Sequence, residues 1–220
     1  MADRDAGDDR IEILSADELR KTVTRLASQV LESVPTVESL VLLGIPTRGV
    51  QLADVLARSL KDQSGHAVAT GTLDPTFHRD DLGRVGVRMV QATDLPVSVE
   101  GRDVVLVDDV VFTGRTVRAA LEAIQAWGRP RRVSLLVMVD RGHRELPIQP
   151  DFCGRVVPTR RSERLNYACL AWMGRRVFSY DASMKTTLND QACFSLLGSV
   201  RPLGSELCNG QKPQQQEELG

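Results

Sequence analysis

Residues 104–119 read VVLVDDVVFTGRTVRA, and this stretch decides the fold. It begins as an apolar run, passes through the adjacent acids Asp108 and Asp109, and reaches the turn Thr113-Gly114-Arg115-Thr116 before a helix-like pattern starts at Val117. A short apolar run of this kind suits a strand that is buried on both faces. A strand that leads through a glycine-containing turn into a helix predicts a crossover unit of a parallel sheet.

Elements of the same two kinds alternate on either side of this stretch. The runs SLVLLGI at 39–45 and VSLLVMV at 133–139 are typical of buried strands. We expect strands at 39–45, 67–73, 103–107 and 133–139, and helices at 19–34, 49–60 and 117–127. Ser15, followed three residues later by Glu18, predicts a capping box before the first helix. The alternation indicates an α/β fold: a doubly wound, mostly parallel sheet with flanking helices.

The composition is that of an ordinary globular protein. Of 220 residues 42% are hydrophobic, and 28 Lys+Arg against 29 Asp+Glu leave a formal net charge of -1, so no overall basic field attracts nucleic acid or membrane. The longest apolar run, 135–139, is far shorter than the roughly 20 residues of a membrane-spanning helix. The N-terminus lacks an apolar signal segment and the four cysteines are widely spaced. We therefore expect a cytoplasmic protein with no disulfide scaffold or zinc site and no membrane partner.

The pattern changes along the chain and predicts three parts. We expect a disordered N-terminus at 1–10, one domain at 11–164, and an atypical, partly disordered C-terminal extension at 165–220. The extension loses the periodicity of the preceding domain and ends in the polar tail QKPQQQEELG. It is either a lineage-specific extension or the product of a shifted reading frame.

The turn after the central strand carries groups that suit a phosphate monoester. In open α/β sheets, ligands bind at the carboxyl ends of the strands. A turn that opens a helix supplies backbone N–H donors and the positive end of the helix dipole. Thr113 and Thr116 add hydroxyl donors, and the carboxylates of Asp108 and Asp109 suit the hydroxyls of a ribose. The pattern indicates a phosphorylated pentose, although neither a P-loop nor a Gly-x-Gly-x-x-Gly motif occurs.

Four segments of the chain resemble one known family. VLVDDVVFTGRTVRAAL at 105–121 is similar to the phosphoribosyl-pyrophosphate (PRPP) motif of type I phosphoribosyltransferases. GIPTRGVQLA at 44–53, TFHRDDL at 76–82 and VMVDRGHRELPI at 137–148 resemble, in the same order, segments of the PyrR family of bifunctional pyrimidine operon regulators and uracil phosphoribosyltransferases. The likeness spans about 11–163, nearly three-quarters of the chain.

The resemblance implies an activity and the residues that perform it. PRPP and uracil would give uridine monophosphate (UMP) and pyrophosphate, with Mg²⁺ bound to the PRPP and held by Asp108 and Asp109 through water rather than directly. The implied catalytic residues are Asp108, Asp109 and Arg79. The implied PRPP- and pyrophosphate-binding residues are Thr47, Arg48, Gly49, Asp108, Asp109, Val110, Val111, Phe112, Thr113, Gly114, Arg115 and Thr116.

Two further segments receive roles from the same resemblance. Residues 74–86 correspond to a lid that closes over the substrates, with Arg79 on the pyrophosphate and His78 where the family commonly has Tyr. Arg141 and Gly142 are candidates for the uracil pocket, although Arg141 is equally suited to a structural pair with Asp140 or Glu145.

A second function in the family is the binding of a leader mRNA by a homo-oligomer. Nine arginines against four acids between Arg129 and Arg164 give a local positive excess. The candidate RNA contacts are Thr24, Arg25, His143, Arg144 and Arg155. Ser28 and Gln149 stand where the family often has basic residues, so the transferase ranks before the RNA regulator. The alternatives are an RNA-binding attenuation regulator with vestigial transferase activity and a purine phosphoribosyltransferase.

Overall fold

The computed structural model describes residues 10–46, 48–80, 92–161, 164–167 and 178–181. The chain divides into two units, Met1–Ser183 and Met184–Gly220, and the second lies wholly outside the described residues. The disorder predicted for the N-terminus therefore falls almost entirely outside them, as does most of the predicted extension. No helix in the described ranges is long and apolar enough to cross a bilayer.

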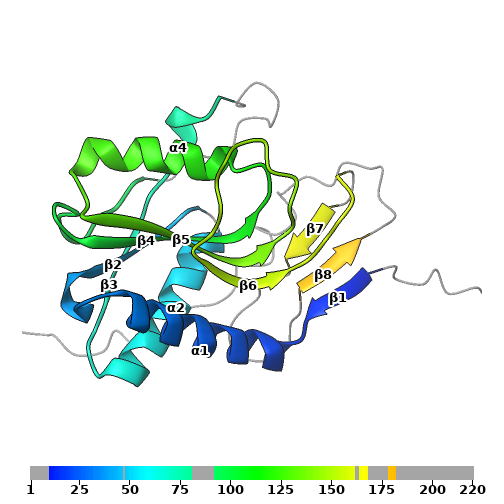
Figure 1. Ribbon diagram of the computed structural model, residues 1–220, viewed down its shortest axis with the longest axis horizontal. Helices are drawn as coiled ribbons and strands as arrows, with labels where there is room; N and C mark the ends of the chain where they lie inside the picture. Colours follow the sequence, from blue (N-terminus) through cyan, green and yellow to red (C-terminus); the bar gives the residue numbers. More distant parts are fainter. Residues whose placement is uncertain (1–9, 47, 81–91, 162–163, 168–177, 182–220) are drawn as a thin grey trace, which may run out of the picture. The chain divides into compact units, whose positions relative to one another are not determined.

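The centre of the first unit is a parallel sheet of five strands (Figure 1). The strands are β2 (Leu40–Gly44), β3 (Ala69–Thr72), β4 (Asp103–Val111), β5 (Arg132–Asp140) and β6 (Phe152–Val156). Their order is β3-β2-β4-β5-β6, and each neighbouring pair is parallel. The predicted α/β fold with a doubly wound parallel sheet is confirmed.

Helices cover both faces of this sheet. In Figure 1, α1 (Ala16–Ser33) and α2 (Arg48–Ser64) lie on one face and α4 (Arg115–Ile124) lies on the other. Short 3₁₀ helices lie after α1 at η1 (Val37–Ser39), after β3 at η2 (Thr76–His78) and after α4 at η3 (Gln125–Trp127). The capping box predicted for the first helix is present: Ser15 Oγ accepts a hydrogen bond from Glu18 N at 3.3 Å, and the Glu18 carboxylate accepts one from Ser15 N at 2.8 Å.

Alternate residues of the central strands pack into two separate cores, because successive side chains of a strand point to opposite faces. Leu42, Val105 and Met138 belong to the core beneath α1 and α2. Their chain neighbours Leu43, Leu106 and Val137 belong to the core beneath α4. The apolar runs of the sequence are therefore buried on both sides, as expected for a parallel sheet.

Two features differ from the expectation. β4 continues to Val111, so Asp108 and Asp109 lie within its carboxyl-terminal half and not beyond its end. A second sheet, with the order β1-β8-β7, joins β1 (Arg10–Leu14) to β8 (Phe178–Asp181) and β7 (Arg164–Tyr167) by antiparallel pairing. Short stretches at and beyond the predicted boundary therefore form strands, and the boundary near Arg164 stays a prediction.

Candidate active site

The carboxyl ends of β2 and β4 bring two helix starts to the same edge of the sheet. β2 leads towards α2 and β4 leads into α4. Gly49, in the first turn of α2, lies directly against the carbonyl group of Val107, where a Cβ atom would clash. The same carbonyl oxygen accepts a hydrogen bond from Ile45 N at 2.9 Å. Glycine at position 49 therefore lets the start of α2 approach the acidic end of β4.

The backbone fixes the acidic pair at this edge. Asp108 is buried, and its Oδ1 accepts a hydrogen bond from Asp109 N at 2.9 Å. Asp109 Oδ1 accepts a hydrogen bond from Val110 N at 2.9 Å, and its Oδ2 lies 3.5 Å from Arg48 Nη1. The structure therefore brings together Arg48 and Asp109, which the sequence assigned to the pyrophosphate and to the ribose hydroxyls of the same substrate.

The turn that follows presents the positive end of α4. Gly114 is the N-cap residue, with a φ of 89° that favours glycine, and Thr113 Oγ1 accepts a hydrogen bond from Arg115 N at 3.4 Å. The first amides of an α-helix have no intrahelical acceptor, and α4 has no acidic residue in its first turn. Such an end attracts an anion by its N–H groups and its dipole together.

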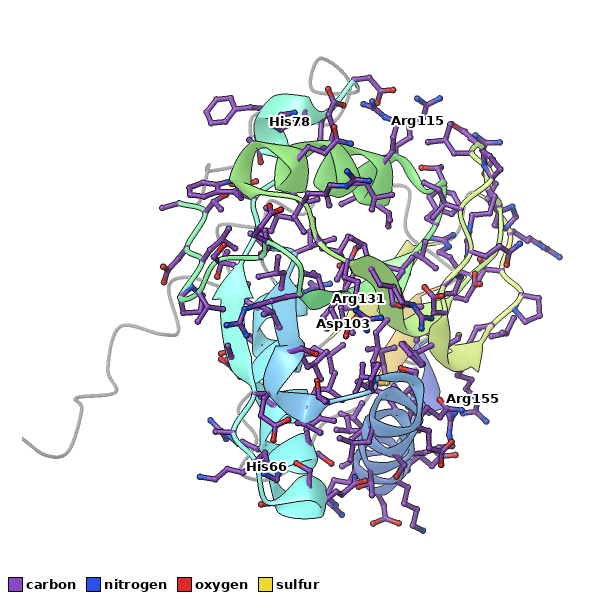
Figure 2. The ribbon with its side chains drawn as sticks, turned by 60° about the vertical axis from the view of Figure 1, so that its left-hand side comes forward. His66, His78, Asp103, Arg115, Arg131 and Arg155 are labelled. Carbon is purple, nitrogen blue, oxygen red and sulfur yellow. The ribbon has the colours of Figure 1, made fainter. Side chains whose placement is uncertain are left out.

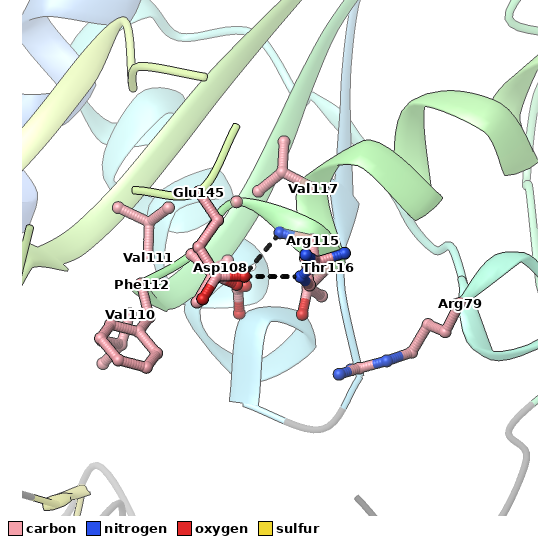
Figure 3. Close-up of a pocket in the computed structure, with 11 residues that line it drawn as sticks. Arg79, Asp108, Val110, Val111, Phe112, Arg115, Thr116, Val117 and Glu145 are labelled. Carbon is pink, nitrogen blue, oxygen red and sulfur yellow. Dashed lines mark hydrogen bonds and ion pairs between the residues drawn. The ribbon is translucent and has the colours of Figure 1, made fainter. Parts of the chain in front are cut away.

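A pocket of about 390 Å³ opens at this turn (Figure 3). It is lined by Arg79, Asp108, Val110, Val111, Phe112, Thr113, Gly114, Arg115, Thr116, Val117 and Glu145. Nine of these are residues to which the sequence assigned catalysis or PRPP binding. Among the described residues so assigned, Arg48, Gly49 and Asp109 are beside the pocket rather than in its wall. Thr47 lies outside the described residues.

Arg115 lies between two carboxylates at the pocket. Its Nε donates to Glu145 Oε2 at 2.8 Å and its Nη1 to Asp80 Oδ2 at 2.7 Å. The hydrogen bond that Arg115 donates to Glu145 and the charge of Asp80 raise the pKa of Arg115, and the same hydrogen bond lowers the pKa of Glu145. Arg161 forms a second ion pair with Glu145. The sequence assigned no role to Glu145 in the pocket, although it lies within a segment that carries the family resemblance.

Backbone hydrogen bonds hold the loop after β5 against the turn at 113–116. The N–H groups of Glu145 and Leu146 donate to the carbonyl oxygen of Thr113 at 3.0 and 3.3 Å. The Arg144 guanidinium donates to Phe112 O at 2.9 Å and to Asp140 Oδ2 at 2.7 Å. Arg144, a candidate RNA contact, is therefore engaged within this loop, and its side chain is only 16% exposed.

Arg141 contacts the ring of Phe112 and the segment around Thr159. Its guanidinium lies 4.2 Å from the centre of the Phe112 ring, and its Nε donates to Thr159 Oγ1 at 3.1 Å. His143, another candidate RNA contact, meets the same ring edge-on at 5.5 Å between centroids. Neither Arg141 nor Gly142 is in the pocket wall, so their role with uracil stays a prediction.

The remaining candidate RNA contacts lie where α1 passes β6. Thr24 and Arg25 are exposed on α1, and Arg25 Nη2 donates to the carbonyl oxygen of Gly154 in β6 at 2.7 Å. Arg155 Nη1 lies 3.7 Å from Glu18 Oε1, at the exposed surface of the same two elements (Figure 2). Thr24, Arg25 and Arg155 therefore belong to one surface.

The base of the predicted lid contacts α4. Arg118 Nη2 donates to the carbonyl oxygen of His78 at 2.9 Å, and His78 Nδ1 lies 3.7 Å from Glu122 Oε1. Arg79 follows directly and reaches the pocket wall (Figure 3). Residues 81–91, which include the rest of the lid, lie outside the described residues.

The fold of this chain is shared with known proteins. The model of the phosphoribosyl transferase domain family matches residues 10–159. A hypoxanthine-guanine phosphoribosyltransferase from Bacillus anthracis matches with a TM-score of 0.59 at 17% identity, over 79% of this chain and 98% of that chain. A hypoxanthine phosphoribosyltransferase from Trypanosoma cruzi matches with a TM-score of 0.54 at 21% identity, over 67% of this chain and 81% of that one. At these identities the two structures show the fold, which is that of a type I phosphoribosyltransferase.

Sequence relatives are much closer. The protein named bifunctional protein PyrR from Trichormus variabilis is 52% identical over 165 residues, which are 75% of this chain and 92% of the relative. That of Thermosynechococcus vestitus is 55% identical over 154 residues, 70% of this chain and 84% of the relative. The chain belongs to the PyrR family of phosphoribosyltransferases.

Proposed function

We propose that the protein transfers the phosphoribosyl group of PRPP to uracil, giving UMP and pyrophosphate. The observation that carries this proposal is the pocket at the start of α4, where Asp108 forms part of the same wall as the turn at 113–116. A 5′-phosphate at the turn places the ribose hydroxyls towards the acidic pair. The choice of uracil rests on the close PyrR relatives.

The charges around the pocket suit the transition state of this transfer. Cleavage at the anomeric carbon builds positive charge on the ribose, while negative charge grows on the departing pyrophosphate. Asp108 and Asp109 supply negative charge on the sugar side. Arg79 in the wall and Arg48 beside it supply the cations for the pyrophosphate.

The donor set fits an Mg²⁺ ion that reaches the site with PRPP. No cluster of three or more His, Cys, Asp or Glu side chains able to hold a metal occurs in the part of the chain that the structure describes. Mg²⁺ commonly takes one or two carboxylates and completes its shell with phosphate oxygens and water. Asp108 and Asp109 would hold the ion through its water molecules, and the bound ion would neutralise charge on the pyrophosphate. The carboxylates themselves remain oriented by the amides of Asp109 and Val110.

The activity test compares four acceptor bases. Turnover of PRPP in the presence of Mg²⁺ is measured with uracil, hypoxanthine, guanine and orotate, and the released pyrophosphate is quantified. We expect turnover with uracil and none above background with the other three. Turnover with a purine and not with uracil would replace this proposal by a purine phosphoribosyltransferase.

A second function, binding of a leader mRNA under the control of UMP, is favoured by the surface where α1 passes β6. This surface carries Arg25 and Arg155 on neighbouring elements and lies apart from the residues of the pocket wall. Cations on one face provide phosphate contacts that do not depend on sequence. We place this protein in the cytoplasm as a homo-oligomer, with PRPP, uracil and UMP at the pocket and RNA at this surface.

A further inference from the structure

A carboxylate in the wall of an anion-binding pocket calls for an explanation. Glu145 lines the pocket together with the turn at 113–116, where a phosphate is expected. Its side chain is 27% exposed, so water screens its charge only in part. A phosphate dianion that entered the pocket would be repelled by Glu145 unless neighbouring cations compensated.

Glu145 is paired with the cation that a phosphate would use. Glu145 Oε2 accepts the Nε–H of Arg115 at 2.8 Å, and Arg115 is in the first turn of α4. A cation there faces the positive end of the helix dipole, which is an unfavourable position without an anion nearby. α4 itself supplies no acid in that turn, so Glu145 and Asp80 provide anions from other segments. In Figure 3 the Glu145 and Arg115 side chains face each other at the pocket.

The loop that carries Glu145 does not depend on its carboxylate for its position. The backbone N–H groups of Glu145 and Leu146 already bind Thr113 O. The Arg144 side chain adds hydrogen bonds to Phe112 O and Ile148 O at 2.9 and 2.8 Å. These contacts hold the loop against the turn whether or not the carboxylate is present.

We infer that the Glu145 carboxylate competes with the phosphate of the ligand for Arg115. It pairs with Arg115 when no phosphate is bound, and the phosphate displaces it. This inference rests on the proposed binding of a phosphorylated pentose. Asp80, at the base of the lid, holds the other side of the Arg115 guanidinium at 2.7 Å. When Arg115 is released from Glu145, Arg115 stays paired with Asp80 at the base of the lid. Binding of the phosphate therefore changes the ion pair of Asp80. Glu145 thus weakens ligand affinity and favours release of the product.

The test is a binding measurement with ribose 5-phosphate, which carries the phosphate and the sugar but no base. Calorimetric titrations compare the wild-type chain with Glu145→Gln. We expect Glu145→Gln to lower the dissociation constant about two- to fivefold, the range of a partly exposed ion pair. The gain shrinks as salt is raised from low to high concentration, because it is electrostatic. The melting temperature stays within about 2 °C of wild type, as for other surface substitutions.

Glu32→Gln is the matched control. Glu32 is exposed on α1 and is not in the pocket wall. This substitution removes the same charge, and we expect its dissociation constant to equal that of wild type. Unchanged or weaker binding by Glu145→Gln, or an equal gain in Glu32→Gln, overturns the inference, as does a melting temperature lowered by several degrees. Failure of the wild-type chain to bind ribose 5-phosphate contradicts the proposed function itself.

Discussion

Gly49 in the first turn of α2 packs directly against the carbonyl group of Val107 in β4. This contact joins the helix that carries Arg48 to the strand that carries the acidic pair. The close approach depends on the missing Cβ atom, because the group it would meet is backbone and cannot rotate away.

Replacement of this glycine therefore separates the two halves of the site. Gly49→Ala forces the start of α2 away from β4, and we expect a loss of about 1–3 kcal/mol in unfolding free energy, typical of overpacking. Urea unfolding measures this loss. Asp54→Ala, at an exposed position of the same helix, is the control and should change the value by less than about 0.5 kcal/mol. Equal stability of the two variants would show that the contact is not tight.

The capping box of α1 predicts a pH dependence. The backbone N–H and hydroxyl of Ser15 donate to the Glu18 carboxylate and lower its pKa below 4.5. A carboxyl group with a lowered pKa in the folded state stabilises the protein above its unfolded pKa, and this contribution is lost as the pH falls through the folded pKa. We therefore expect Glu18→Gln to be less stable than wild type at pH 6, and the difference to shrink as the pH falls towards 3.

Urea midpoints across this pH range check that prediction. Glu32→Gln, at an exposed position near the end of the same helix, is the matched control because Glu32 forms no part of the cap. A stability difference for Glu18→Gln that stayed constant from pH 6 to pH 3 would argue against the capping role of the carboxylate.

The α1–β6 surface predicts a specific response of RNA binding to salt. Arg155→Gln removes one cation, so we expect weaker binding to a stem-loop RNA and a salt dependence whose logarithmic slope is smaller by about one. Filter binding over a salt series gives both values. Arg129→Gln removes an exposed arginine from the segment that precedes β5, and should leave both values unchanged. An identical effect of the two substitutions would mean that RNA does not use the α1–β6 surface in particular.

Much of this architecture was predictable because it depends on local pattern. The apolar runs at 39–45 and 133–139 correspond to β2 and β5, and Ser15 and Glu18 form the expected cap. The turn residues 113–116 all reach the pocket wall because they follow a buried strand directly. The start of α4 was predicted less well. The helix begins at Arg115, two residues before the expected start, because Gly114 with its positive φ is the N-cap residue.

Other features depend on contacts between distant segments, which a single sequence does not display. The pairing of Glu145 with Arg115 joins residues 30 positions apart. β4 continues through Asp108 and Asp109 because the strand stays paired with β5 on both sides of Asp109, with Asp108 opposite Val137 and Val110 opposite Val139. The sheet of β1, β8 and β7 consists of short antiparallel strands without a sustained apolar run.

The most direct test of the central claim is calorimetric titration of PRPP with Mg²⁺ into the wild-type chain and the Asp108→Asn/Asp109→Asn variant. The exchange keeps the shape of both side chains and removes the charges that face the ribose. We expect wild type to bind PRPP and the variant to bind about 10- to 100-fold more weakly, as for lost hydrogen bonds to charged groups. Absence of binding by wild type, or equal affinity of the two proteins, would contradict the assignment of this pocket to a phosphorylated pentose.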